Sequence, residues 1–285
     1  MFTPKQTRLA PQGYPPRAKV GDLFDWNDPS YKPIDYTWAK LVDEDKPSWA
    51  DEKYVPFLDM LDRLATTRDG KKAKIRACCM YDFTAGRFLN PAGKTGITGR
   101  GVLGKWGANW AADVIVTKEV DGELFVLLCT KVAQDGDALC FPAGMVESGE
   151  EVPIAMRREL CEEAVQNSPA VDTLFSEGKV GTIYIGHVDD YRNTDHAWMV
   201  TQATHFHASP EVAAKLVLNV KDKEEISKSC WYKAEEVGDM YASHKDWLNK
   251  VIDWHRARRV PDLRCDEPDL SVAADVPVGS KRPRD

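Results

Sequence analysis

The stretch from residue 144 to residue 165, GMVESGEEVPIAMRRELCEEAV, constrains the fold most because it joins a glycine loop directly to a helix. Pro153 is tolerated only near a helix start, where its missing N–H would have no partner, so the helix is predicted to begin near Glu151 or Val152. The residues that follow are good helix formers without Gly or Pro. Residues three and four apart share a helix face. The apolar stripe of this helix is predicted to comprise Met156, Leu160 and Ala164.

The other side of this helix carries Glu159, Glu162 and Glu163. Like charges at this spacing destabilise a helix by a few tenths of a kcal/mol per pair, and a divalent cation would offset that repulsion. Carboxylate oxygens suit Mg²⁺, with Mn²⁺ as the alternative ion. Arg158 can reach Glu162 along the helix or Glu150 in the preceding loop, and so brace the loop against the helix. Taken alone, the three glutamates are also compatible with a solvated acidic helix face.

Length and composition exclude several classes of protein. A chain of 285 residues can hold one large domain or two modest ones. The net charge of −7 argues against a general nucleic-acid-binding protein, which needs a basic surface. No apolar run approaches the length of a membrane span, so no membrane partner is expected. The chain is expected to act on a small molecule as a monomer.

The seven cysteines are scattered without zinc-type spacing, which fits a reducing compartment better than a disulfide scaffold. The cytoplasm is therefore the predicted location. Mitochondrial import is the alternative, because residues 1–21 hold four basic residues and no acidic residue. Four prolines in the same segment oppose the amphipathic helix that a transit peptide needs.

Hydrophobic periodicity and turn residues predict the remaining elements. The Asp121-Gly122 pair, between runs rich in β-forming residues, predicts a hairpin with a type I′ turn. Further strands are predicted at residues 179–188, 198–206 and 229–232. Helices are predicted at residues 56–67 and, from a possible capping box at Ser243, near the end of the chain.

Two segments without regular periodicity are candidates for ligand binding. Residues 90–113 are rich in glycine, which favours either a loop that cradles phosphate or a tight link between two domains. In the first case Lys94 and Arg100 would contact a diphosphate. The segment VDDYRNTDHAWM contains Asp190 and Arg192; Arg binds phosphate in a bidentate manner, and Asp can bind ribose hydroxyls. An Asx-rich turn with surface ion pairs is the alternative for this segment.

The spacing from Gly144 through Glu150 to Arg158-Glu159-Leu160-Cys161-Glu162-Glu163 resembles the Nudix box, the signature of hydrolases that cleave nucleoside diphosphates linked to another moiety. The resemblance implies that Gly144, Glu150 and Arg158 maintain the structure of the box. It also implies a metal site at Glu159, Glu162 and Glu163, with Glu162 or Glu163 as the catalytic base. The chain departs from the usual pattern at Val165 and Gln166, beyond the carboxylates.

Three further segments, VDDYRNTDHAWM, NPAGKTGITGRG with GANWAAD, and Tyr241-Ala242-Ser243-His244, resemble the eukaryotic mitochondrial-type ADP-ribose pyrophosphatases. They also resemble the related ADP-ribose-binding domain of melastatin-type channels. The resemblance implies ADP-ribose contacts at Asp190, Arg192, Tyr241 and His244. The chain departs from this family at residues 107–114 and at Tyr191, which affects the expected substrate preference rather than the reaction class.

The resemblance implies an α/β fold in which residues 108–259 form a Nudix α/β/α sandwich and residues 20–107 a smaller N-terminal α+β domain. Residues 1–19 are expected to be an extended arm and residues 260–285 a disordered tail. The expected activity is metal-dependent hydrolysis of ADP-ribose to AMP and ribose 5-phosphate. The alternatives are an ADP-ribose sensor that does not hydrolyse its ligand, and a Nudix hydrolase of another nucleoside diphosphate derivative.

Overall fold

The structure is a computed structural model that describes residues 14–42, 47, 50–51, 80–82, 87–132, 137–147, 149–221, 223 and 225–259. The helix predicted at residues 56–67, most of the predicted arm and the predicted tail at residues 260–285 lie outside the described residues. Within the described part, none of the helices combines the length and the apolar character that a membrane crossing requires.

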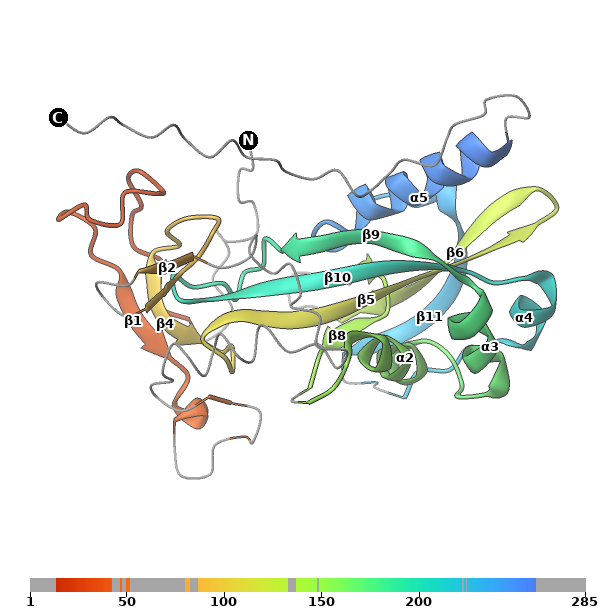
Figure 1. The fold of residues 1–285 in the computed structure, drawn as a ribbon, viewed down its shortest axis with the longest axis horizontal. Helices are drawn as coiled ribbons and strands as arrows, with labels where there is room; N and C mark the ends of the chain where they lie inside the picture. Colours follow the sequence, from red (N-terminus) through yellow and green to blue (C-terminus); the bar gives the residue numbers. More distant parts are fainter. Residues whose placement is uncertain are drawn as a thin grey trace, which may run out of the picture.

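A seven-stranded mixed sheet forms the centre of the molecule, with the strand order β11-β6-β5-β10-β9 (Figure 1). Strand β7 extends the sheet from β6, and β8 pairs with β5. β5 and β10 are parallel, whereas the other pairs in this sheet are antiparallel. The strands are β5 (Gly107–Val120), β6 (Glu123–Lys131), β7 (Ala138–Cys140), β8 (Ala143–Met145), β9 (Lys179–His187), β10 (Ala197–His207) and β11 (Ile226–Lys233).

The hairpin between β5 and β6 turns at Asp121 and Gly122, as predicted. Both residues have positive φ, 50° and 77°, which is the requirement of a type I′ turn. The turn fixes the register, so that Val120 lies opposite Glu123 and Thr117 lies opposite Val126. The predicted strands at residues 179–188, 198–206 and 229–232 are also confirmed, as β9, β10 and β11.

Helices cover both faces of the sheet, so the predicted α/β/α sandwich is confirmed. Figure 1 shows α5 above the long strands and α2 and α3 below them. Because side chains alternate along a strand, even-numbered residues of β5 such as Val114 pack with α2 and α3, and odd-numbered residues such as Ile115 pack with α5. The helices are α2 (Val152–Glu163), α3 (Pro169–Glu177), α4 (Pro210–Lys215) and α5 (His244–Arg259), with a short 3₁₀ helix, η4 (Ala234–Glu236).

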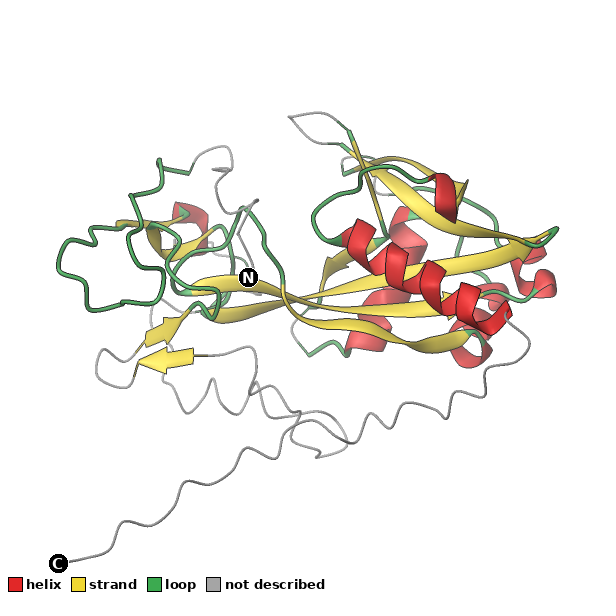
Figure 2. Ribbon diagram, turned by 90° about the horizontal axis from the view of Figure 1, so that it is seen from above, coloured by secondary structure: helices red, strands yellow, loops and turns green. Residues whose placement is uncertain are grey.

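The N-terminal strands lie beyond one end of the long strands of the main sheet (Figure 2). Two pairs are described: β1 (Ile34–Thr37) with β4 (Ile97–Gly101), and β2 (Met80–Asp82) with β3 (Arg87–Leu89). A 3₁₀ helix, η2, spans Ala39–Leu41.

The glycine-rich stretch from residue 90 to residue 113 contains β4, the first residues of β5 and the connections that precede each of them. Its glycines permit close backbone approach: a Cβ atom on Gly99 would lie 2.4 Å from the carbonyl oxygen of Tyr36. Gly99 also has φ of 81°, which disfavours other residues. The packing of residues 93–101 against residues 17–37 favours the linking role over the phosphate-cradling role for this part.

Candidate active site

A cavity of about 770 Å³ opens between the main sheet, the C-terminal half of α2 and the start of α5. Its lining comes from the loop between β4 and β5 (residues 102–105), the first half of β5, β8 with the residues on either side of it, the acidic face of α2, the loop after β9, β10, and the loop before α5 with the first turn of α5. Lys131 and Glu225 complete the lining. The predicted site residues on these walls are Gly144, Arg158, Glu159, Glu162, Glu163, Asp190, Arg192, Tyr241 and His244.

Helix α2 begins where the sequence predicted, with Glu151 at its N-cap and Pro153 in its first turn. It packs its apolar stripe, including Leu160, onto the sheet and turns its glutamates toward β8. The approach is close: a Cβ atom on Gly144 would lie 2.1 Å from the carboxyl carbon of Glu159. Glycine at position 144 therefore leaves the space that the Glu159 carboxylate occupies.

Arg158 joins the loop before α2 to the helix, as predicted, and it contacts both predicted partners, Glu150 and Glu162. Its Nε and Nη2 donate to the two carboxylate oxygens of Glu150, each at 2.9 Å. Its Nη1 donates to Glu159 at 2.6 Å and to Glu162 at 3.2 Å. The hydrogen bonds from Arg158 lower the pKa of Glu150. The bidentate geometry holds Glu150 as a structural residue of the loop.

Glu163 and Glu159 are buried carboxylates, with 4% and 8% of their surface exposed. Burial raises the pKa of Glu163 to about 8, although the backbone N–H of Ala143 donates to its Oε2 at 2.8 Å. Burial also raises the pKa of Glu159, against the opposing effect of Arg158. The side chain of Glu162 is 43% exposed. Three carboxylates in one cavity, two of them desolvated, form an oxygen donor set that fits a hard divalent cation such as Mg²⁺.

Asp190 and Arg192 form a bidentate ion pair on the opposite wall of the cavity. Nε and Nη2 of Arg192 donate to the two carboxylate oxygens of Asp190, each at 2.8 Å. Burial opposes ionisation of Asp190, but the charge and hydrogen bonds of Arg192 outweigh it and lower its pKa. Asp190 thus orients the guanidinium, whose side chain remains 30% exposed. An oriented, partly exposed guanidinium in a cavity can bind an anionic group of a ligand.

The third wall is formed by His244 at the start of α5. The backbone N–H of Phe141 donates to its Nδ1 at 3.0 Å, so the ring proton lies on Nε2, which is 3.2 Å from Oδ1 of Asp113. Thr201 donates to the other oxygen of Asp113 at 2.5 Å. The imidazole also stacks on the ring of Trp247, with centroids 5.1 Å apart. These contacts fix both the tautomer and the orientation of His244.

Asp113 is a cavity residue that the sequence analysis did not identify. It lies on β5 with only 3% of its surface exposed, and it anchors both His244 and Thr201. One signal was available: a single acidic residue interrupts the otherwise apolar run Ala-Ala-Asp-Val-Ile-Val that leads into the predicted hairpin. A buried charge requires partners, so an acid at such a position indicates a polar network.

Arg100 is the predicted substrate-binding residue that the structure does not bring to the cavity. It is fully buried, and its Nη1 donates to the carbonyl oxygens of Asp51 and Gly104 at 2.8 and 2.6 Å. Its guanidinium also lies 5.3 Å from the ring centroid of Trp106. Arg100 therefore holds backbone segments of the N-terminal region together. Lys94 is buried as well, 4.4 Å from the ring centroid of Tyr31 and away from the cavity lining.

The segment VDDYRNTDHAWM divides between two roles. Asp190 and Arg192 face the cavity, whereas the residues from Asn193 to His196 contact the N-terminal region. Asp195 accepts hydrogen bonds from the Tyr31 hydroxyl and from Thr95. His196 contacts the carbonyl oxygen of Phe88 through Nδ1 at 2.7 Å, and burial lowers its pKa. His196 is thus a structural residue rather than part of the cavity wall.

Comparison with known proteins gives matches along most of the chain. Residues 108–255 match the family described as NUDIX domain, and residues 19–107 match the family described as NUDT9-like, N-terminal domain. The chain is 33% identical over 275 residues to the mitochondrial ADP-ribose pyrophosphatase of Rattus norvegicus. That alignment covers 88% of this chain and 76% of the relative. It is 37% identical over 193 residues to putative nudix hydrolase 6 of Caenorhabditis elegans, covering 66% and 72% of the two chains.

A similar match extends to an ion channel. The chain is 30% identical over 243 residues to transient receptor potential cation channel subfamily M member 2 of Mus musculus. That alignment covers 75% of this chain but only 16% of the channel. The similarity therefore concerns one part of the channel.

Proposed function

Because the chain belongs to the NUDIX domain family, we propose that it hydrolyses ADP-ribose to AMP and ribose 5-phosphate with a divalent cation. The reaction adds water across the diphosphate: one P–O bond of the bridging oxygen breaks and a new P–O bond forms to the water oxygen. The observation that carries this proposal is the convergence of the three box glutamates, the Asp190–Arg192 pair and His244 on one cavity. The relative from Rattus norvegicus, named an ADP-ribose pyrophosphatase, supports the choice of substrate.

Glu159, Glu162 and Glu163 are the proposed metal ligands, with Mg²⁺ as the proposed ion and Mn²⁺ as the alternative. Such an ion supplies charge neutralisation of the diphosphate and lowers the pKa of a bound water. Glu162 and Glu163 are the proposed acceptors for the proton of the attacking water. Arg158 donates to Glu159 and Glu162 and so restrains both carboxylates before the substrate binds.

Other residues of the cavity lining would bind the substrate directly. We assign a phosphate of ADP-ribose to Arg192, whose guanidinium is oriented by Asp190. Tyr241 and His244 line the same end of the cavity and would contact a base or a ribose. The Nε2–H of His244 is committed to Asp113 and its ring stacks on Phe141 and Trp247, so His244 has no free donor for the substrate.

The first experiment is release of AMP from ADP-ribose by the purified chain with Mg²⁺, with and without excess EDTA. We expect AMP and ribose 5-phosphate in equal amounts, and no product with EDTA. The double variant Glu162→Gln, Glu163→Gln should lose at least about a hundredfold in kcat, as expected for removal of ligand and base together. Glu177→Gln, at an exposed position at the end of α3, is the matched control and should keep full activity.

Two rivals have distinct outcomes in the same experiment. Saturable ADP-ribose binding without AMP release would identify a sensor that does not hydrolyse its ligand, as the partial match to a channel allows. Faster turnover of NADH or of a dinucleoside polyphosphate in a substrate panel would identify a different Nudix substrate. Full turnover by the Glu162→Gln, Glu163→Gln double variant would overturn the proposed use of the box.

Two further properties, the oligomeric state and the cellular compartment, can be tested with the same purified or tagged chain. We propose a monomer, which light scattering after size-exclusion chromatography would test. For location, the name of the relative from Rattus norvegicus supports the mitochondrion, and a reducing cytoplasm remains the alternative. Microscopy of the full chain with a C-terminal fluorescent tag distinguishes these compartments.

A further inference from the structure

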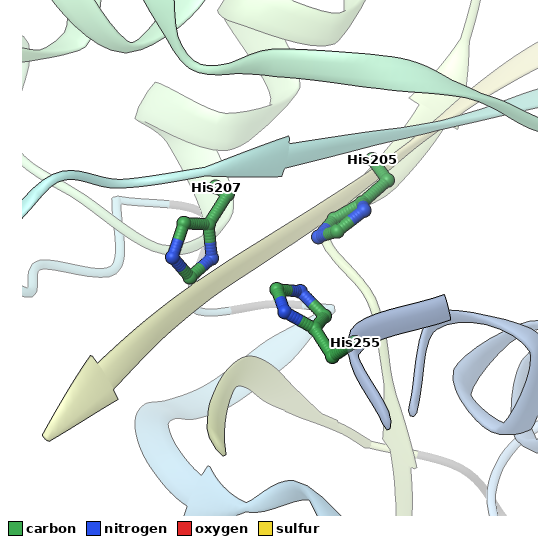
Figure 3. A group of neighbouring side chains, drawn as sticks. All are labelled: His205, His207 and His255. Atoms are coloured by element: carbon green, nitrogen blue, oxygen red, sulfur yellow. The ribbon is translucent and has the colours of Figure 1, made fainter. Parts of the chain in front are cut away.

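Three of the six histidines of the chain gather at the far end of α5 from the cavity (Figure 3). His205 and His207 lie two residues apart on β10, so they point to the same face of the sheet. His255 approaches them from α5. One side-chain nitrogen from each histidine lies within 4.8 Å of the others.

The hydroxyl of Thr117 lies among these nitrogens. It is 2.7 Å from Nε2 of His205, 2.9 Å from Nδ1 of His207 and 3.5 Å from Nε2 of His255. Thr117 belongs to β5 and is paired directly with His207 across the parallel strands. The hydroxyl can donate to one ring and accept from two, so it is compatible with all three rings. The three imidazole nitrogens thus converge on one point, which is the geometry that a single bound ion would need.

The histidines are desolvated, and none is beside the box carboxylates. His205 is fully buried, and its Nδ1 has no hydrogen-bond partner among the described residues. Burial lowers the pKa of His205 to about 3 and also lowers the pKa of His207. His255 has 9% of its surface exposed, whereas His207 is only partly buried and gives the cluster a route to solvent.

We propose that His205, His207 and His255 bind one transition-metal ion, such as Zn²⁺, through their imidazole nitrogens. Neutral imidazole suits Zn²⁺, Cu²⁺ or Ni²⁺, whereas Mg²⁺ prefers oxygen ligands, so the ion differs in kind from that of the glutamate site. Zn–N bonds of about 2.0–2.1 Å place ligand nitrogens roughly 3.3 Å apart in a tetrahedron, so binding requires the three rings, whose nitrogens lie within 4.8 Å of one another, to turn toward the ion. The fourth position is left for water or for the hydroxyl of Thr117.

The site is separate from the cavity. His244, at the cavity, and His255 are eleven residues apart on α5, which corresponds to about 16 Å along a helix. Asp113 and Thr117 are four residues apart on β5, or about 13 Å. A bound ion would join the C-terminal half of α5 to β10, and so hold onto the sheet the same helix whose first residue is His244. The ion is thus a structural tether and takes no part in hydrolysis.

The test uses the full chain, stripped with EDTA, desalted and titrated with Zn²⁺. Extended X-ray absorption fine structure at the zinc edge counts imidazole ligands, and calorimetry gives the affinity. The variant His207→Gln, His255→Gln removes two ligands, and His187→Gln is the matched histidine control outside the cluster. The variant Glu159→Gln, Glu162→Gln weakens the carboxylate site, which can also bind Zn²⁺.

We expect one Zn²⁺ with three imidazole nitrogens in the unmodified chain, in the His187→Gln control and in the carboxylate variant. The double histidine variant should lose this signature and bind at that site at least about a hundredfold more weakly. Zn²⁺ should raise the melting temperature of the carboxylate variant, and it should raise that of the double histidine variant by less than that of the unmodified chain, because an ion that binds only the folded state stabilises it.

Two outcomes would overturn the proposal. One is a zinc spectrum of the unmodified chain with oxygen ligands alone; the other is a histidine variant that keeps the imidazole signature. Either would identify the cluster as a metal-free hydrogen-bond network around Thr117. If the histidine variant does not fold, the zinc spectrum and the Zn²⁺-dependent melting of the carboxylate variant decide the question.

Discussion

Gly144 and Glu159 approach each other more closely than any side chain at position 144 would allow. The carboxylate of Glu159 fills the space where a Cβ atom would lie, and Arg158 holds it there from the other side. Because the carboxylate is the end of a flexible side chain, it can move aside without disturbing the backbone. A substitution at this position therefore tests the geometry of the carboxylates separately from the fold.

We predict that Gly144→Ala folds normally but needs a higher Mg²⁺ concentration for half-maximal hydrolysis, with a kcat at least about tenfold lower, since small misplacements at a reacting centre are costly. The measurement is hydrolysis of ADP-ribose as a function of Mg²⁺ concentration, with thermal melting to check the fold. Gly181→Ala is the control, because a Cβ atom at that position would meet nothing within 4 Å. A metal dependence of Gly144→Ala equal to that of the control would contradict the prediction.

Residue roles were predictable where a local spacing determines the contact. Arg158 reaches Glu162 because residues four apart share a helix face, and it reaches Glu150 because the loop before α2 is short. Asp113 was missed because its partner, His244, is distant in sequence and approaches only through tertiary packing. Arg100 was assigned to a diphosphate on the basis of its glycine-rich surroundings, but those glycines serve close backbone packing.

At the scale of elements, α2 both carries the box and anchors it to the sheet. Leu160 is fully buried on its apolar stripe, whereas Ile154 on the same helix is 52% exposed. We predict that Leu160→Ala lowers the free energy of unfolding by about 2–5 kcal/mol through lost burial and the cavity it leaves. Ile154→Ala should change it by no more than about 0.5 kcal/mol. Urea unfolding of the two variants measures both values, and similar losses would contradict this account of the helix.

The loop that carries Arg192 is held in place by Arg17. The guanidinium of Arg17 donates to the carbonyl oxygens of Tyr191 at 2.6 Å, Asn193 at 3.0 Å and Thr95 at 3.1 Å. Arg17 itself does not line the cavity. It is therefore a positioning residue that acts through the backbone on either side of Arg192.

We predict that Arg17→Ala raises the KM for ADP-ribose by about tenfold, equivalent to roughly 1.4 kcal/mol, because the loop loses hydrogen bonds from a charged donor. The Mg²⁺ dependence should stay unchanged, since Arg17 has no contact with the box. Steady-state kinetics at several Mg²⁺ concentrations give both values. Arg157→Ala, which removes a surface ion pair with Asp172, is the control. An altered Mg²⁺ dependence of Arg17→Ala with an unchanged KM would contradict the proposed role.

The sequence predicted the long elements better than the short ones. The β5–β6 hairpin and α2 carry strong local signals, namely a type I′ turn pair and a proline followed by helix formers. By contrast, α4 has six residues and β8 has three, too few to show a periodicity. Such short elements depend on tertiary contacts. Strand β8, for example, is defined by its backbone pairing with residues 111–113 of β5.

At the scale of the whole molecule, a buried carboxylate is one of the contacts that join the N-terminal region to the main sheet. Asp195 has 1% of its surface exposed and follows the loop that bears Arg192. It accepts from the Tyr31 hydroxyl at 2.5 Å, and from the backbone N–H and the hydroxyl of Thr95 at 2.6 and 2.8 Å. The same hydroxyl of Tyr31 accepts from the backbone N–H of Gly96 at 2.9 Å. This chain of contacts joins segments that lie 164 residues apart, a distance over which sequence patterns carry no information.

Replacing Asp195 by Asn removes the charge and one acceptor oxygen while keeping the shape of the side chain. We predict that Asp195→Asn lowers the free energy of unfolding by about 2–3 kcal/mol, because a buried donor loses its charged acceptor. Tyr31→Phe should cost less, and the double variant should cost clearly less than the two single changes added together, since both remove the same hydrogen bond. Urea unfolding of the three variants gives this coupling, and Asp172→Asn at the surface should change stability by no more than about 1 kcal/mol. Additive losses would mean that the hydrogen bond between Tyr31 and Asp195 does not contribute to stability, and that the other contacts between the two regions hold them together.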